Sequence, residues 1–482
     1  MPGLDSAAEP VEPAAGMNSG RNDPASSRSA SRLAIAGWVL FDWACQPFFT
    51  LVITFVYAPY FASAVVGDAT HGQALWGFAT GLAGIFIALF SPVLGAIADA
   101  TGRRKPWIAG FGVLLVVGSA LLWFGMPGDA STIPIVLIAF VVGAIGVEFA
   151  TVFNNSMMPS LVPKERLGRL SGLGWGMGYV GGLASLVVAL GFLAANPESG
   201  KTLFGLTPLF GLDPVLREGD RVTGPLTALW FIVFVLPLFL FTPDGARGLP
   251  LSRAIGSGWA AIRGTFREAR HHRNLGLFLL ANMIYADGLV ALFAFGGIYA
   301  VGTFGWHTIE LGIFGILLTI TGTIGAISGG WLDDRFGPKR VIIGALLLLI
   351  LASAAILSVD RDKILFVIAV TPPAAGGGLF SGTAEKLYVS LGLLIGLAAG
   401  PLQAASRTLL ARLAPQEKLA EFFGLFALSG KITSFAAPTL VASVTAVTAS
   451  QKAGVSVLLA FFTVGTLLLA RVRISGGSAA PR

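Results

Sequence analysis

The sequence contains the stretch Gly95-Ala-Ile-Ala-Asp99-Ala-Thr-Gly102-Arg103-Arg104-Lys105 directly after a long apolar run. A second copy, Gly330-Trp-Leu-Asp-Asp334-Arg-Phe-Gly337-Pro-Lys339-Arg340, follows 235 residues later, again after an apolar run. The glycines permit a tight turn, the Asp stands near a helix end where it can cap a neighbour, and the cations favour a membrane surface. A further pair, residues 163–167 and 415–419, repeats the pattern Pro-x-Glu-cation-Leu with an offset of 252. The chain therefore has two similar halves that run in the same direction.

Composition excludes a soluble protein. Of the 482 residues, 55% are hydrophobic and 12% are charged, about half of the ~25% charged residues of soluble domains. A soluble enzyme, a nucleic-acid-binding protein or a secreted module would need a more charged surface. The single cysteine, Cys45, and four histidines outside the apolar runs offer no internal disulfide, metal site or buried histidine pair. We expect a polytopic membrane protein without a cofactor, a metal or a nucleic-acid partner.

Apolar runs of about 20 residues are needed to cross ~30 Å of hydrocarbon. Twelve runs meet this condition, and they predict an all-α integral membrane protein with two pseudo-twofold bundles of six helices. The stretches 195–224 and 359–386 are expected to be external loops, with a hairpin as the alternative for the second one. The predicted helices are 34–63, 73–98, 106–126, 132–157, 171–194, 225–242, 275–302, 309–332, 340–358, 387–409, 420–447 and 453–472.

The distribution of Lys and Arg predicts the orientation. One alternating set of loops, tails and adjoining helix ends carries 24 of these residues, and the other set carries 7. The positive-inside rule then places both termini in the cytoplasm, with the chain in the inner (cell) membrane. The predicted parts are a disordered cytoplasmic tail (1–32), an N-terminal bundle (33–242), a cytoplasmic linker with an amphipathic helix (243–274), a C-terminal bundle (275–472) and a cytoplasmic tail (473–482).

The doubled loop in a twelve-helix chain resembles the signature of the major facilitator superfamily. Residues 41–44, 155–159, 171–182 and 421–431 are similar to its vacuole-effluxer-like (Unknown Major Facilitator) branch, whose fungal members export amino acids from the vacuole. The resemblance implies a monomeric secondary transporter of a small molecule that works by alternating access. It also implies a cytoplasmic latch between helices 2 and 11 and between 5 and 8, which stabilises the outward-open state. The latch residues are Gly95, Asp99, Gly102, Arg103, Gly330, Asp334, Gly337 and Lys339.

The first latch predicts a specific contact. Asp99 should accept hydrogen bonds from the free N–H groups that start helix 11, near Ala420, and should balance the charge of Arg103. In helix 5, Gly174, Gly178 and Gly182 recur at every fourth residue, a spacing typical of a closely packed helix face.

Four ionisable residues, Asp42, Glu148, Asp287 and Lys431, lie within predicted helices, where insertion of a charge costs about 2.5–3.5 kcal/mol. Helices 1, 4, 7 and 10 line the central cavity of the facilitator fold, so three of the four fall on cavity helices. One hypothesis is a polar site whose carboxylate binds a proton as substrate leaves. The structural alternative pairs the carboxylates with Lys431, Arg407 or backbone groups. The candidate substrate- and proton-binding residues are Asp42, Gln46, Glu148, Asn154, Asn155, Asn282, Tyr285, Asp287, Gln403, Arg407 and Lys431.

The favoured function is amino-acid efflux coupled to protons. A facilitator for another substrate class (a drug, a sugar or a lipid-like molecule) is the main alternative. A membrane-embedded enzyme is less favoured, because the sequence shows no His–carboxylate cluster, nucleophile elbow or metal-ligand spacing. A channel is less favoured because of the parallel repeat and the carboxylates on the predicted cavity helices.

Overall fold

A computed structural model describes residues 30–196, 199–255, 273–306, 308–371, 379–431, 433–434 and 436–473. Within these ranges eleven helices are long and apolar enough to cross a membrane. Both predicted tails lie largely outside the described residues. Of the predicted linker helix, residues 251–255 are helical and residues 256–272 lie outside the described part.

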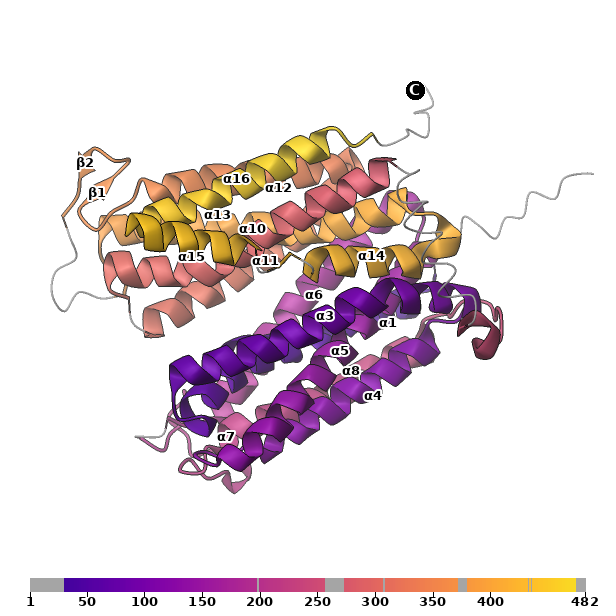
Figure 1. Ribbon diagram of the computed structural model, residues 1–482, viewed down its shortest axis with the longest axis horizontal. Helices are drawn as coiled ribbons and strands as arrows, with labels where there is room; N and C mark the ends of the chain where they lie inside the picture. The colour runs from indigo at the N-terminus through magenta and orange to yellow at the C-terminus, as the bar shows by residue number, and fades with distance from the viewer. Residues whose placement is uncertain are drawn as a thin grey trace, which may run out of the picture.

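The N-terminal half forms one bundle, drawn from indigo to magenta in Figure 1. Its first spanning segment is long and irregular, because π-helical turns at residues 48–55 and 61–65 interrupt it. Short α7 precedes the last helix of this half. The helices are α1 (Arg32–Pro47), α2 (Tyr57–Tyr60), α3 (Ala69–Thr101), α4 (Lys105–Leu121), α5 (Ile133–Met157), α6 (Leu167–Val188), α7 (Glu218–Arg221) and α8 (Thr223–Phe241).

The C-terminal half forms the second bundle, drawn from pink to yellow in Figure 1. Its predicted helix 420–447 is divided at a turn into two helices of 13 residues each. All twelve predicted helices are therefore present, eleven as long spans and one in two pieces. The helices are α10 (Arg273–Phe304), α11 (Thr308–Phe336), α12 (Pro338–Leu357), α13 (Thr383–Leu413), α14 (Leu419–Lys431), α15 (Ala436–Thr448) and α16 (Gln451–Ala470).

The loop between α12 and α13 contains a small antiparallel hairpin. Its strands are β1 (Lys363–Ile364) and β2 (Ile368–Ala369), with Lys363 opposite Ala369. The sequence predicts a loop or hairpin over 359–386, and the hairpin is present.

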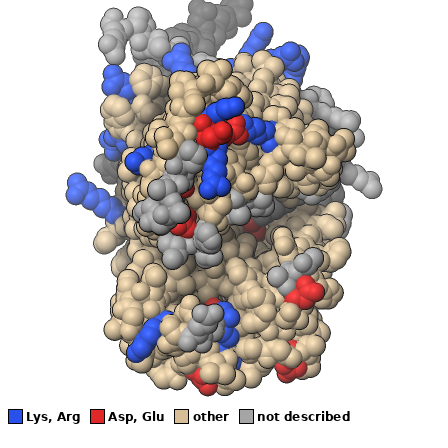
Figure 2. All heavy atoms as spheres, turned by 90° about the vertical axis from the view of Figure 1, so that its left-hand side faces the viewer, with Lys and Arg blue, Asp and Glu red and all other residues tan. Residues whose placement is uncertain are grey.

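The two bundles meet at one end of the molecule and diverge at the other (Figure 1). At the meeting end α3 packs against α14, and α6 packs against α11. We call this the closed end; it carries the two repeated loops. The opposite end, which carries α7 and the β1–β2 hairpin, is the open end. Figure 2 views the open end and shows its surface hollowed between the bundles.

Helix α6 lies between the two bundles and presents glycine to both. Gly174 faces α1 so closely that a Cβ atom there would lie 2.5 Å from Asp42 Oδ2. On its other side, a Cβ atom at Gly172 would meet the backbone of Ala326 and Gly330 in α11. The predicted close-packed face of helix 5 is confirmed, and a second glycine face, which the sequence analysis missed, brings α6 against the C-terminal bundle.

Candidate functional site

A buried cluster around Arg407 joins the two bundles. The residue lies on α13, and its Nη1 donates to Asp42 Oδ2 at 3.1 Å and to Asn155 Oδ1 at 2.9 Å. Its Nε donates to Ser171 Oγ at 2.9 Å, and its Nη2 donates to the Ser171 carbonyl at 2.7 Å. Arg407 is only 3% exposed. All these partners belong to the N-terminal bundle, so the pairing of Asp42 with Arg407 is a buried contact between halves.

Two indole rings flank the guanidinium. Arg407 lies over Trp38, with 5.1 Å from Cζ to the ring centroid, and 5.8 Å from the ring of Trp175. Such cation–π contacts are stronger when desolvated. Trp38 is fixed in turn because its Nε1 donates to the Asn154 carbonyl at 2.8 Å. The ion pair is therefore shielded from water and has its hydrogen-bonding groups largely satisfied.

Further polar side chains lie on the open-end side of this cluster. Gln403, one turn before Arg407 on α13, donates to the Tyr179 hydroxyl at 2.9 Å. Gln46, one turn after Asp42 on α1, packs beside Gly178 and Gly182 of α6. All three polar side chains are half-buried. Tyr179 was missed by the sequence analysis; its position among the helix-5 glycines was the one available signal.

Two of the predicted residues, Asn282 and Tyr285, lie elsewhere. Asn282 donates to Ser429 Oγ at 3.3 Å, and the Tyr285 and Ser406 hydroxyls are 2.7 Å apart. Among the described residues, the hydrogen-bond partners of both belong to the C-terminal bundle, so their side chains turn toward the inside of their own bundle and do not join the Arg407 cluster. A role for them in substrate binding stays a prediction.

Asp287 also lies inside the C-terminal bundle. It is 2% exposed and faces Thr433, in the turn that separates α14 from α15. Its Oδ1 has no hydrogen-bond partner among the described residues. A carboxylate in this position is costly to keep charged.

The remaining candidates are less informative. Glu148 is half-buried on α5 and lies within electrostatic range of Cys45, as does Asp42. The amide of Asn154 is buried, and neither of its side-chain atoms has a partner in the described part of the chain. The side chain of Lys431 lies outside the described part, so its pairing with a carboxylate stays a prediction.

The two repeated loops make equivalent contacts at the closed end. Asp99 accepts hydrogen bonds from the backbone N–H groups of Ala420 at 3.2 Å and Glu421 at 2.8 Å. Asp334 accepts from those of Gly168 at 2.8 Å and Arg169 at 3.3 Å. Each carboxylate thus caps the first turn of a helix in the opposite bundle, where free N–H groups and the helix dipole favour an anion. The contact predicted near Ala420 is present.

The cation that pairs with Asp99 differs from the prediction. Asp99 forms its ion pair with Arg104, whereas Arg103 is exposed. The expected pairing with Arg103 is wrong because the chain turns at Gly102, with φ of +77°, and directs the next side chain outward. In the second loop, Lys339 Nζ donates to the carbonyl of Ala470 at the end of α16 at 2.8 Å.

The second loop holds two ion pairs that the sequence analysis missed. Asp333, 1% exposed, pairs with Arg412 at 3.3 Å, and Asp334 pairs with Arg169 at 3.1 Å. Glycine at position 330 lets the backbones of α11 and α6 approach each other closely: a Cβ atom at Gly330 would lie 2.5 Å from the Gly168 carbonyl oxygen.

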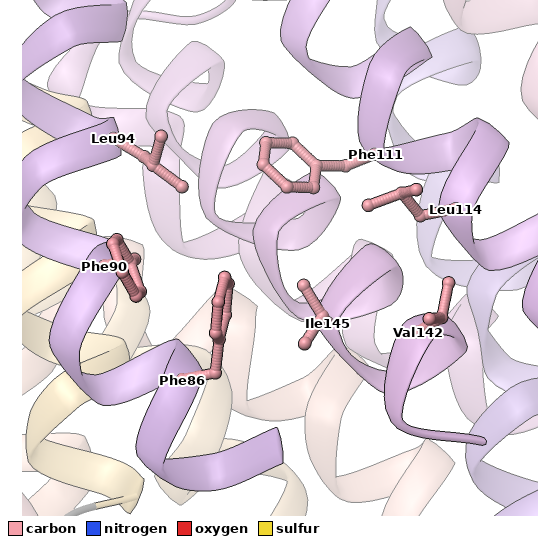
Figure 3. A pocket seen from close by; sticks show the side chains of 7 residues that line it. All are labelled: Phe86, Phe90, Leu94, Phe111, Leu114, Val142 and Ile145. Carbon is pink, nitrogen blue, oxygen red and sulfur yellow. The ribbon is translucent and has the colours of Figure 1, made fainter. Parts of the chain in front are cut away.

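A separate groove of about 340 Å³ lies between α3, α4 and α5 (Figure 3). Its lining is entirely apolar, and Phe86 and Leu114 are exposed at its edge. A polar solute would find no hydrogen-bonding group there, so this groove is not the candidate site. Its lining residues are Phe86, Phe90, Leu94, Phe111, Leu114, Val142 and Ile145.

Comparison with known proteins identifies the relatives. A family model described as "Vacuole effluxer Atg22 like" matches residues 62–480. The chain is 25% identical over 447 residues to the uncharacterized MFS-type transporter YxiO of Bacillus subtilis (strain 168), covering 90% of this chain and 94% of that one. It is 25% identical over 292 residues to autophagy-related protein 22 of Coccidioides immitis (strain RS), covering 58% of this chain and 44% of that one. The match spans less than half of the fungal relative.

Solved structures give the same fold. The chain is similar to the outward conformation of FucP, a major facilitator superfamily transporter, with a TM-score of 0.63, 16% identity and coverage of 92% and 98%. A bacterial homologue of the iron transporter ferroportin, in its outward-facing state, gives a TM-score of 0.64 at 14% identity, covering 91% and 98%. The human organic anion transporter MFSD10 gives 0.65 at 16% identity, covering 91% and 99%. At these identities the likeness establishes the major facilitator fold.

Proposed function

Because this chain belongs to the vacuole effluxer Atg22-like family of MFS-type transporters, we propose that it exports a small organic solute by alternating access, driven by protons. Its fold and its relatives are those of membrane transporters, not enzymes. Amino acids are the proposed substrate class, since the fungal members of the resembling branch export them. The fungal relative is matched over less than half of its length, so the substrate class is the part of the proposal to be tested first.

The arrangement of the bundles supports alternating access. Both capping carboxylates, Asp99 and Asp334, bridge the bundles at the closed end, while the opposite end is hollowed (Figure 2). In the proposed orientation the closed end faces the cytoplasm, because the loops there carry most of the Lys and Arg. The structure then corresponds to an outward-open state, and the two capping contacts must break before the cytoplasmic side opens.

The observation that carries proton coupling is the environment of Asp287. Its side chain is buried at the turn between α14 and α15, and its Oδ1 has no partner among the described residues. Binding a proton removes the charge and with it most of the desolvation cost. Glu148, half-buried on a predicted cavity helix, is the second candidate carrier.

Transport in proteoliposomes tests this proposal. With a labelled mixture of the twenty L-amino acids and a pH gradient, Asp287→Asn or Glu148→Gln should abolish gradient-driven accumulation when that residue carries the proton. Exchange between internal and external amino acids needs no net proton movement, so it should survive. Accumulation equal to that of the parent in both variants would contradict coupling through these residues.

Asp129→Asn is the matched control. Asp129 is exposed in a loop at the open end, and hydrogen bonds from the hydroxyl and the backbone N–H of Ser131 lower its pKa below the ordinary value. The group is therefore ionised throughout the neutral range and exchanges no proton during the cycle. This variant should accumulate amino acids as the parent does.

A further inference from the structure

We propose that the Arg407–Asp42 ion pair fills the substrate site in the outward-open state, and that a zwitterionic solute replaces it when the closed end opens. The solute carries one carboxylate, which binds Arg407, and one ammonium group, which binds Asp42. This inference rests on the proposed function, because it requires the bundles to separate at the closed end. It adds the chemical rule by which the site selects its substrate.

All the hydrogen bonds of the pair cross between bundles. Arg407 lies on α13, whereas Asp42, Asn155 and Ser171 lie on α1, α5 and α6. Separation of the bundles at this end therefore removes, in one movement, every hydrogen-bond partner that the guanidinium has in the described part of the chain. It also removes the only cation that forms an ion pair with Asp42 among the described residues.

Two separated charges in this position need new partners. The Asp42 side chain is 14% exposed and that of Arg407 is 4% exposed, beneath the rings of Trp38 and Trp175. Once the bundles separate, water reaches both groups, but a bound solute excludes that water and must itself supply the partners, because a buried charge without a partner is costly. A carboxylate matches the planar fork of a guanidinium, and an ammonium group complements Asp42. A solute with both groups satisfies both residues, whereas a solute with one group leaves the other residue unpaired.

The same contacts provide a route for release. When the closed end forms again, Asp42 and Arg407 recombine in the volume that the charged groups of the solute occupied. The solute is displaced toward Gln46, Tyr179 and Gln403, the half-buried polar side chains on the open-end side. Formation of the ion pair thus competes with substrate in the outward-open state and favours export.

The first test measures the conformational equilibrium without any solute. Spin labels are attached to E165C and E417C in a C45A background; Glu165 and Glu417 are exposed and equivalent in the two halves. R407Q or D42N leaves one buried charge without its charged partner while the closed end is closed, whereas water reaches that charge once this end opens. The population with the open-state distance, relative to that with the closed-state distance, should therefore rise at least about tenfold. The double variant D42N/R407Q buries no charge and should shift the ratio less than either single variant.

The matched control is D360N, which breaks the 2.7 Å ion pair between Asp360 and Lys452. That pair lies within the C-terminal half, so the distance distribution at the closed end should not change. Single variants at Asp42 and Arg407 that leave the distribution as it is in the parent would overturn the proposed role of the pair.

The second test uses the parent protein and therefore does not depend on the folding of any variant. Counterflow is measured with a labelled mixture of the twenty L-amino acids. Each amino acid that exchanges is compared as a competitor with its amine and acid analogues; for leucine these are isoamylamine and 4-methylpentanoate. Each analogue should compete at least about tenfold more weakly.

Equal competition by a singly charged analogue would overturn the zwitterion rule, as would the absence of exchange for all twenty amino acids when another solute exchanges. Failure of proton coupling is distinguishable, because it would appear as normal accumulation in the Asp287→Asn and Glu148→Gln variants, whatever charges the solute carries.

Discussion

Asn155 and Arg407 occupy equivalent positions in the two halves, 252 residues apart, and form a hydrogen bond with each other at 2.9 Å. The same offset relates the loops 163–167 and 415–419. Two equivalent residues can touch only near the pseudo-twofold axis, so this bond marks where that axis crosses the interface. One half contributes the amide of Asn155 and the other half the guanidinium of Arg407, so a single positive charge lies near the axis. The carboxylate of Asp42 neutralises this charge.

The topology can be checked with reporter fusions. Fusions placed after residues 68, 129 and 305 should all report an external location, since these positions follow predicted helices that end on the side poor in Lys and Arg. A cytoplasmic signal from any of the three would contradict the proposed orientation.

Asp99→Ala should slow transport while leaving insertion and folding nearly intact. The variant removes a charged acceptor from the N–H groups of Ala420 and Glu421, and a hydrogen bond to a charged group contributes about 1.5–3 kcal/mol. Because the contact exists only while the closed end is closed, the loss should change the rate of substrate exchange about tenfold or more. Initial rates in proteoliposomes measure this effect, and unchanged turnover would exclude a role for the contact.

Arg104→Ala and Arg103→Ala form a matched pair. Arg104 pairs with Asp99 and donates to the hydroxyl of Ser156 at 3.1 Å, whereas Arg103 is exposed one residue earlier. Only the first variant should slow exchange appreciably, and the second should stay within about twofold of the parent, because an exposed charge contributes about 0–1 kcal/mol. A larger decrease in the exchange rate for Arg103→Ala than for Arg104→Ala would show that the latch uses the cation expected from the sequence.

Gly174→Ala should disturb the Arg407 cluster. The new methyl group would lie 2.5 Å from Asp42 Oδ2 and 2.9 Å from Arg407 Nη2, whereas at Gly178 its nearest atom is at 3.4 Å. Overpacking of this kind costs about 1–3 kcal/mol. We expect a lower melting temperature and reduced transport for Gly174→Ala, with Gly178→Ala much closer to the parent. Equal melting temperatures in the two variants would contradict this account.

Arg412→Gln should destabilise the protein more than Asp333→Asn. The Asp333 side chain is 1% exposed and that of Arg412 is 21% exposed, so loss of the arginine leaves the more deeply buried charge without its partner. Removing one member of a buried pair costs about 3–5 kcal/mol, while the partly exposed Arg412 can turn to water when Asp333 is neutralised. Thermal unfolding in detergent compares the melting temperatures of the two variants. A larger decrease for Asp333→Asn than for Arg412→Gln would contradict this prediction.

The fold was largely predictable because its determinants repeat along the chain. Apolar runs set the helices, and the spaced Gly, Asp and Gly residues of the two loops located a contact as specific as that between Asp99 and Ala420. The break in helix 420–447 was not predicted, although Gly430 and Lys431 and the polar Thr433 and Ser434 interrupt the apolar run at that point.

The candidate site was predicted only in part, because a residue list contains no helix rotation. Asp42, Asn155 and Arg407 come together, whereas Asn282 and Tyr285 turn into their own bundle. Which of Arg103 and Arg104 meets Asp99 depends on a backbone turn at Gly102. Such choices depend on geometry between distant segments, which spacing along one segment does not encode.

The turn between α14 and α15 divides the eleventh spanning segment mechanically. Helix α14 packs against α3 and α5 of the other half, whereas α15 packs against α16 and α10 of its own half. Helix α14 also packs against α10 of its own half, and its contact with Asp99 must break when the closed end opens. Helix α14 therefore lies at the interface between the bundles whereas α15 packs only within its own half among these contacts, and the turn at residues 433–434 is the joint between the two pieces. When the two bundles rotate relative to each other, this segment can bend at the joint instead of moving as one continuous helix. Amide hydrogens at the joint should therefore exchange with solvent sooner than those at the middle of either helix.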